Sequence, residues 1–228
     1  MFLCRSTHFL RTTCFSTRNC VECCAMRRYR TTNAYDPPSN SQPKCGPKLY
    51  DTHIPTTQAQ KVSLFLTSSF SAFLDPSRAD AVAAVGDVSS SYQLRSLHEM
   101  MCSTESGQRV LRERPVLHDQ RFDLEALRGL APNTFGHAYA KFMQNHHFDP
   151  SSRPNVRYVD DPDYAYVMLR YRESHDFYHV LTGLPPSVEG EMALKLIEWG
   201  WSGLPVAGLS GVFGGVREVG EEGRRFER

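Results

Sequence analysis

The chain has 228 residues, with 26 basic and 25 acidic side chains and a formal charge of +1. Near-neutral charge excludes a dedicated nucleic-acid-binding protein, which needs a basic face to release counterions from phosphates. The hydrophobic content of 40% and the aromatic content of 11% exclude a wholly disordered chain. No stretch of about 18 or more apolar residues occurs, so the sequence contains no membrane-spanning helix.

The first 30 residues differ in charge from the rest. Residues 1–30 contain six arginines, no lysine and one acidic residue, a net +5, whereas the remaining chain carries −4. An arginine-rich, Ser/Thr-rich and acid-poor N-terminus is typical of an organelle transit peptide. Arg11 and Arg18 interrupt every candidate apolar core of a secretory signal. We therefore predict a transit peptide over residues 1–30, with a basic tail without a targeting role as the alternative, followed by a Pro/Ser/Asn-rich linker over residues 31–48.

The cysteines follow the same division. Five of the seven lie in the N-terminal segment, which leaves Cys45 and Cys102 in the body. Two isolated cysteines indicate free thiols in a reducing compartment. The pair Cys20-x-x-Cys23 has half of a zinc-ribbon spacing but no downstream partner pair, so it is a weak metal motif.

The body shows helical periodicity and no alternating run long enough to build a sheet. In chain order, the expected helices are 58–74, a short one from Asp75-Pro76 to Gly86, 92–102, 106–113, 124–130, one after the Asn133-Thr134 cap, one from Asp161-Pro162 to Gly183, and one from Ser187 through Trp199. The predicted fold class is all-α, a multi-helix single domain. The 58–74 helix suits either a largely buried or a membrane-facing position.

The helix between Asp161 and Gly183 is the most informative. Five of its residues form one stripe that should face the core: Tyr164, Met168, Tyr171, His175 and His179. The adjacent His146 and His147 diverge at the end of an earlier helix, where we expect both to be exposed.

The stripe carries the elements of a metal site. His175 and His179 are four residues apart, so they project to one side of a helix and can share one cation. Asp176, rotated by about 100°, would ligate from the edge or orient a histidine. A short loop after Gly183 would return Glu191 to the level of His179. This pattern predicts a metal-binding helical hairpin for zinc, iron or manganese, with a buried polar network without metal as the alternative.

Four sequence blocks, in order, resemble a known family. They are Leu49-Tyr50-x-x-His53-Ile54-Pro55-Thr56, Leu74-Asp75-Pro76-x-Arg78-Ala79-Asp80, Arg112-x-Arg114-Pro115 and Leu184-Pro185-Pro186-Ser187-x-x-Gly190-Glu191. The spacing His-Asp-x-x-His, eleven residues, Glu is the hallmark of ubiquinone (coenzyme Q) biosynthesis proteins of the Coq-four type. The resemblance extends over residues 49–215.

The resemblance implies an all-helical peripheral protein on the matrix side of the mitochondrial inner membrane. It implies Zn²⁺ as cofactor, bound through His175, Asp176, His179 and Glu191. The implied activity is that of a lyase, the C1-decarboxylation of 4-hydroxy-3-methoxy-5-polyprenylbenzoate. The implied partners are the other coenzyme Q biosynthesis enzymes, the prenylated lipid substrate and the membrane surface, with a homodimer left open and nucleic acid excluded. The resemblance does not identify the catalytic proton donor.

Two other functions stay open from the sequence. One is a non-catalytic lipid-binding scaffold that organises the coenzyme Q enzymes, and the other is a generic metal-dependent hydrolase, which only the ligand spacing favours. Residues 62–74 and 203–213 would line a groove for the polyprenyl tail, contact the bilayer surface or pack in the core. Family members continue with further helices, so we assign the helical domain to 49–216, with the family's C-terminal helices missing, and a divergent charged tail to 217–228.

Overall fold

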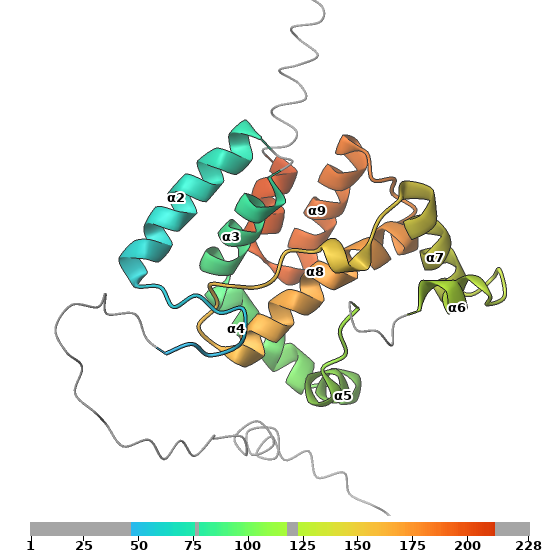
Figure 1. Cartoon of the computed structure of the whole chain (residues 1–228), viewed down its shortest axis with the longest axis horizontal. Coiled ribbons are helices and arrows are strands. Elements are labelled where there is room, and N and C mark those ends of the chain that lie inside the picture. The colour runs from blue at the N-terminus through green and yellow to red at the C-terminus, as the bar shows by residue number, and fades with distance from the viewer. Residues whose placement is uncertain (1–46, 76–77, 118–122, 213–228) are drawn as a thin grey trace, which may run out of the picture. The chain divides into compact units, whose positions relative to one another are not determined.

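The computed structural model describes residues 47–75, 78–117 and 123–212, which all belong to the unit Gln42–Arg228. The helices labelled in Figure 1 are α2 (Gln58–Leu74), α3 (Ala79–Ser89), α4 (Ser91–Cys102), α5 (Glu105–Glu113), α6 (Leu124–Arg128), α7 (Phe135–His146), α8 (Pro162–Thr182) and α9 (Val188–Ser202). A 3₁₀ turn, η1 (Pro150–Ser152), lies between α7 and α8 in the chain. Residues 205–212 are also helical. The described residues contain no β-strand, which confirms the all-α prediction. The predicted transit peptide, most of the linker and the charged tail lie outside these ranges, so their boundaries stay predictions.

Helix α8 begins and ends as its sequence predicts. The Asp161 side chain accepts hydrogen bonds from the backbone N–H groups of Asp163 and Tyr164, and Pro162 occupies the first turn. Gly183 ends the helix in the left-handed conformation with φ of 71°, which a residue without a Cβ adopts at little cost. The 21 residues between these caps give a helix about 30 Å long, enough to carry both histidines and reach the core.

Buried residues lie on more than one face of α8. Met168, Tyr171, His175 and His179 are buried as predicted, while Tyr164 is partly buried. Side chains on its other faces are buried too: Ala165, Tyr166, Val167, Glu173 and Asp176. Helix α4 packs against one part of α8 and α7 against another (Figure 1). Helix α8 is therefore a central helix with several packed faces, which a one-face pattern underestimates.

A buried ion pair joins α3 to α8. The carboxylate of Asp87 accepts hydrogen bonds from the Arg172 guanidinium at 2.7 Å and from the backbone N–H groups of Arg157 at 2.7 Å and Tyr158 at 3.2 Å. Arg172 also donates to the carbonyls of Ala83 and Pro154. Burial raises the pKa of Asp87, and Arg172 and the two N–H groups oppose that rise. This network holds α3, α8 and the 153–159 segment together.

Helix α3 differs from its predicted bounds at both ends. Asp75 is the C-cap of α2, and the α3 N-cap is Arg78, which makes no side-chain capping bond. The helix does not stop at Gly86 but continues to Ser89. A Cβ at Gly86 would lie 3.4 Å from a methyl carbon of Val206, so this glycine permits close helix packing instead of ending the helix.

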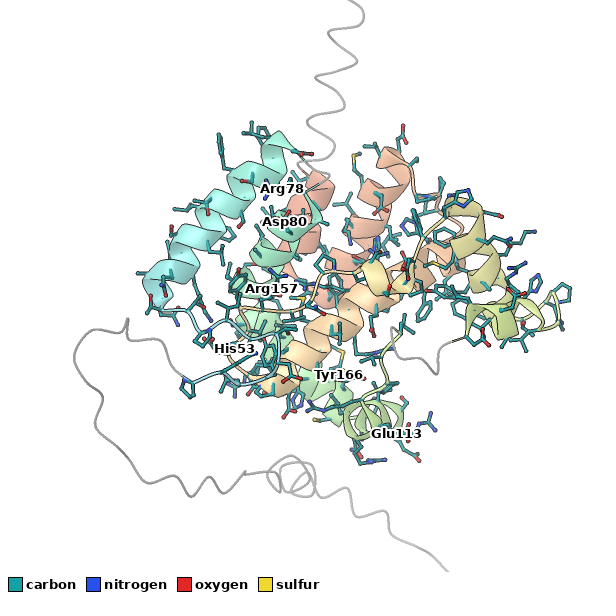
Figure 2. The ribbon with its side chains drawn as sticks, viewed as in Figure 1. His53, Arg78, Asp80, Glu113, Arg157 and Tyr166 are labelled. Carbon is teal, nitrogen blue, oxygen red and sulfur yellow. The ribbon has the colours of Figure 1, made fainter. Side chains whose placement is uncertain are left out.

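The segment before α2 is tied to the residues that precede α8. The ring of buried His53 accepts a hydrogen bond at Nδ1 from the Leu49 N–H, and its Nε2 lies 3.2 Å from Oδ1 of Asp160. The Ile54 N–H donates to the Arg157 carbonyl, and Figure 2 shows His53 and Arg157 in this region. The first family-like block therefore anchors the start of α8.

Helix α2 lies beside α3 and exposes much apolar surface (Figure 1). Its one buried residue is Ser68, so of the two predicted alternatives the largely buried one is wrong, and the membrane-facing one stays a prediction. The large apolar side chains exposed along it are Val62, Leu66, Phe70, Phe73 and Leu74. Among the residues described, no helix combines the length and apolar character needed to cross a bilayer.

The two adjacent histidines and the cysteines of the body lie outside the predicted metal site. His146 and His147 are exposed at the end of α7, as expected. Cys102 is buried, with its Sγ 3.9 Å from the ring nitrogens of His98, whereas Cys45 lies outside the described residues.

Candidate metal centre

The loop between α8 and α9 returns the chain antiparallel to itself. Ser187 caps α9 by accepting a hydrogen bond from the Gly190 N–H, as predicted. Contacts along the two helices then run in opposite order, because His179 meets Glu191 whereas Tyr171 meets Glu198. The hairpin register follows, and it places Glu191 between the two predicted histidine ligands.

The hydrogen-bond partners of His179 indicate which of its ring nitrogens is the donor. Its Nδ1 lies 2.9 Å from the carbonyl oxygen of Leu184, and a carbonyl only accepts hydrogen bonds, so Nδ1 carries a proton. In the neutral ring, Nε2 then has the lone pair, and it faces Oε1 of Glu191 at 3.1 Å. The Phe142 ring stacks on this imidazole at 5.6 Å between centroids, which restricts its rotation.

His175 has the same arrangement with a different partner. Its Nδ1 lies 2.7 Å from Oε1 of Glu198, a fully buried carboxylate. A carboxylate accepts only, so Nδ1 is again the donor and Nε2 faces Oε2 of Glu191 at 3.1 Å. This carboxylate–histidine unit is the arrangement that orients metal-bound imidazoles in proteins.

These residues fit a divalent cation. One ligand atom from each of His175, His179 and Glu191 lies within 4.8 Å of the others. In neutral rings, two nitrogen lone pairs would point at the two oxygens of one carboxylate, which is repulsive unless a proton or a metal ion lies between them. Two imidazoles and one carboxylate are also a ligand set that zinc accepts, with a further position left open.

The carboxylates around His175 favour positive charge on its ring. Burial disfavours the charged form of His175, yet its hydrogen bonds with Glu191 and Glu198 raise its pKa overall. Burial likewise opposes ionisation of Glu191, but the hydrogen bonds from His175 and His179 hold its pKa well below the usual range. The Glu191 side chain is 42% exposed, so the site is open to solvent on this side.

Asp176 does not join the three residues. Its carboxylate is buried and accepts a hydrogen bond from the guanidinium of Arg153, which comes from the segment before α8. The contact of this carboxylate is with Arg153 and not with His175 or His179. Its role as a fourth ligand stays a prediction.

The part that Glu198 has in this site was not predicted from the sequence. Glu198 accepts hydrogen bonds from Tyr171 at 2.7 Å and from Lys195 at 2.8 Å, in addition to His175. The available signal was spacing, since Glu198 follows Glu191 by two helical turns on one face of α9. An acidic residue on the buried side of α9 needs buried partners.

We expect Glu198→Gln to weaken metal binding about 10- to 100-fold, the usual cost of losing the partner of a metal-bound histidine. The amide removes the negative charge that fixes the His175 Nδ1 proton while keeping the side-chain shape. The measurement is a competition titration with a chelating dye. Tyr171→Phe, which leaves the Glu198–His175 bond in place, is the control and should cost much less. Equal affinity of Glu198→Gln and the parent protein would contradict this role.

Gly190 sets how closely α9 approaches the loop before it. A Cβ at this position would lie 1.9 Å from the carbonyl oxygen of Pro185, so alanine forces backbone movement next to Glu191. We expect Gly190→Ala to cost about 1–3 kcal/mol of stability and to weaken metal binding. Gly200→Ala is the control in the same helix, because nothing lies within 4 Å of its added Cβ. Thermal unfolding and the metal titration are measured for both variants. A Gly190→Ala protein with the stability and metal affinity of the parent would refute the argument.

A cavity of about 290 Å³ adjoins the trio. His175 and Glu191 form part of its wall, together with three cationic side chains, Arg153, Arg172 and Lys195. The rest of the wall is largely apolar and includes Val82, Ala83, Met168 and Val206. This volume is at the lower end of small-molecule sites, about 300–1,000 Å³. A ring-sized polar group with an apolar substituent fits its lining.

The fold and the site together define an all-helical protein with a two-histidine, one-carboxylate centre beside a mixed cavity. Residues 50–227 match the family described as "Coenzyme Q (ubiquinone) biosynthesis protein Coq4". The chain belongs to this family.

Curated relatives agree with the family match. The chain is 44% identical over 181 residues to "Ubiquinone biosynthesis protein coq4, mitochondrial" of Pyrenophora tritici-repentis, covering 79% of this chain and 62% of that protein. It is 41% identical to the Yarrowia lipolytica protein over 79% of this chain and 69% of the relative. For Schizosaccharomyces japonicus the identity is 41%, over 82% and 78%. The chain thus spans less than two thirds of the Pyrenophora relative.

A solved structure shares the fold. The crystal structure of a putative ubiquinone biosynthesis protein from Nostoc punctiforme aligns with a TM-score of 0.51 at 22% identity. The alignment covers 70% of this chain and 72% of that one. At this identity the similarity supports the all-helical fold alone.

Proposed function

We propose that this protein acts in ubiquinone biosynthesis as a metal-dependent carboxy-lyase. Its substrate would be 4-hydroxy-3-methoxy-5-polyprenylbenzoate, from which it removes the C1 carboxylate. The observation that carries this proposal is the trio of His175, His179 and Glu191, of which His175 and Glu191 line a cavity with cationic and apolar side chains. An aromatic acid with a prenyl tail has the same two-part character.

The reaction is simple to balance. The bond between ring carbon C1 and the carboxyl carbon breaks, CO₂ leaves, and the electron pair stays on the ring, which takes up one proton. A divalent ion at the trio supplies positive charge that stabilises the anionic head group during this change. His175, His179 and Glu191 hold that ion, Glu198 orients His175, and the apolar wall excludes water from the ring. We propose Zn²⁺ as the ion, with Asp176 as a fourth ligand, since nitrogen and carboxylate donors suit it.

The test follows the leaving carbon. Purified protein is loaded with zinc and given the short-chain prenylated acid labelled with ¹³C at the carboxyl group, and released ¹³CO₂ is measured by mass spectrometry. We expect release that depends on zinc and is lost in His175→Ala. Full release from the chelator-treated protein or from His175→Ala would defeat the metal mechanism.

The proposed location is the matrix side of the mitochondrial inner membrane, as a peripheral protein. The curated relatives carry "mitochondrial" in their names, and residues 1–30 have the composition of a transit peptide. The mitochondrial targeting is tested by fusing residues 1–48 to a fluorescent reporter and following its import. A reporter that stays in the cytosol would contradict it.

A second candidate function is a non-catalytic scaffold that binds lipid and the other coenzyme Q enzymes. The exposed apolar residues of α2, Val62, Leu66 and Phe70 among them, favour it, because scattered surface hydrophobics seldom align on one helix face. The two functions separate in cells. A scaffold retains quinone synthesis in the His175→Ala variant, whereas the enzyme does not.

A further inference from the structure

The cavity wall next to His175 and Glu191 contains several positively charged side chains. Three cationic side chains line it, and each has one buried carboxylate as partner: Asp176 for Arg153, Asp87 for Arg172 and Glu198 for Lys195. They differ in how many of their N–H donors form hydrogen bonds within the protein.

Arg172 uses its donors to connect parts of the fold. Its guanidinium donates to the Asp87 carboxylate and to the carbonyls of Ala83 and Pro154, and only 10% of its side chain is exposed. These bonds connect α3, α8 and the 153–159 segment, so Arg172 is a structural cation in the cavity wall.

Arg153 and Lys195 have donors to spare. Arg153 carries five N–H donors, of which one bonds to Asp176, and its side chain is 32% exposed. Lys195 carries three, and Glu198 accepts one of them, with the side chain 20% exposed. Since Nδ1 of His175 is itself a donor, the Lys195 ammonium 3.1 Å away gains no acceptor there.

The charges of these side chains and of Glu191, which all line the cavity, favour an anion when a divalent ion is bound at the trio. The pairs Arg153–Asp176 and Lys195–Glu198 are each neutral, and Glu191 adds one negative charge. A divalent ion at the trio therefore leaves a single net positive charge, which one ligand carboxylate neutralises. In a partly buried site this attraction is screened less than at the surface.

We propose that Arg153 and Lys195 form a clamp for the carboxylate of the aromatic acid. This inference rests on the proposed function and assigns the orientation of its substrate. The carboxylate lies between the two cations, and the prenyl substituent points along the apolar wall of Val82, Ala83 and Val206. Charge-assisted hydrogen bonds from a planar guanidinium and an ammonium hold that group in one place.

The test compares two ligands that differ only in the carboxylate. Zinc-loaded protein is titrated with 3-methoxy-5-prenylbenzoate and with the same molecule lacking the carboxylate. The acid lacks the 4-hydroxyl group whose electron donation allows ring carbon C1 to take up a proton, so we expect it to bind without turnover. We expect Lys195→Met and Arg153→Met each to weaken binding of the acid about tenfold or more, with the neutral ligand changed less than about twofold. Lys141→Met, on the exposed face of α7, is the matched control and leaves both affinities unchanged.

Further measurements separate the clamp from a structural role. Zinc content and thermal unfolding report whether a variant keeps the fold, and Lys195→Arg, which restores the charge, should recover the preference for the acid. Equal losses for both ligands, or no loss for either, overturn the clamp. If the parent protein binds neither ligand, both proposals fall. If the clamp behaves as expected but no ¹³CO₂ is released from the full substrate, the clamp stands and the decarboxylase proposal fails.

Discussion

Replacing His179 by alanine is expected to lower the affinity for zinc by more than 100-fold. Loss of a partner outside the coordination sphere already costs about 10- to 100-fold, and His179 would be a direct ligand. Its ring is fully buried, with Nδ1 bonded to the Leu184 carbonyl and Nε2 directed at Glu191. The measurement is zinc bound per chain by elemental analysis after dialysis, together with a dye-competition titration.

His146→Ala is the matched control for this prediction. His146 lies exposed at the end of α7 and is not part of the trio. We expect this variant to bind one zinc ion per chain with the parent affinity. If His179→Ala binds zinc with the parent affinity, the trio is not the metal site.

Replacing Asp87 by alanine is expected to destabilise the fold by about 3–5 kcal/mol, the cost of removing one partner of a buried ion pair. The variant leaves the Arg172 guanidinium without its carboxylate and removes the acceptor for two backbone N–H groups. Chemical denaturation followed by circular dichroism measures the free energy of unfolding.

A double variant separates the pair from the packing around it. Replacing both partners, Asp87→Leu with Arg172→Met, removes the charges together, and such exchanges are often neutral for stability. We expect the double variant to be more stable than Asp87→Ala alone. The surface pair Arg78–Asp80, whose side chains are both more than half exposed, offers a control. There Asp80→Ala should change the unfolding free energy little, and a loss as large as that of Asp87→Ala would contradict the argument from burial.

Features set by local chemistry were predictable from the sequence. Asp161, Pro162 and Gly183 fix the ends of α8, because capping bonds and backbone preferences act within a few residues. The i, i+4 spacing of His175 and His179, with the short loop before Ser187, was enough to place Glu191 beside them. Each of these inferences needs only one helix or one hairpin.

Features set by tertiary packing were not predictable in the same way. Gly86 has the local appearance of a helix stop, but Val206, 120 residues later, packs against it and the helix continues. Asp176 meets Arg153 from a segment 23 residues away, a partner that spacing on α8 cannot identify. The exposure of α2 depends on what covers each face of the helix, which its apolar composition does not determine.

X-ray absorption at the zinc edge of the loaded protein tests most directly that His175, His179 and Glu191 hold the metal. The expected spectrum has two imidazole nitrogens at about 2.0–2.1 Å, with carboxylate or water oxygens completing the sphere, and it loses one imidazole in His179→Ala. A spectrum without imidazole scattering, or one that is unchanged in His179→Ala, would contradict the metal centre described above.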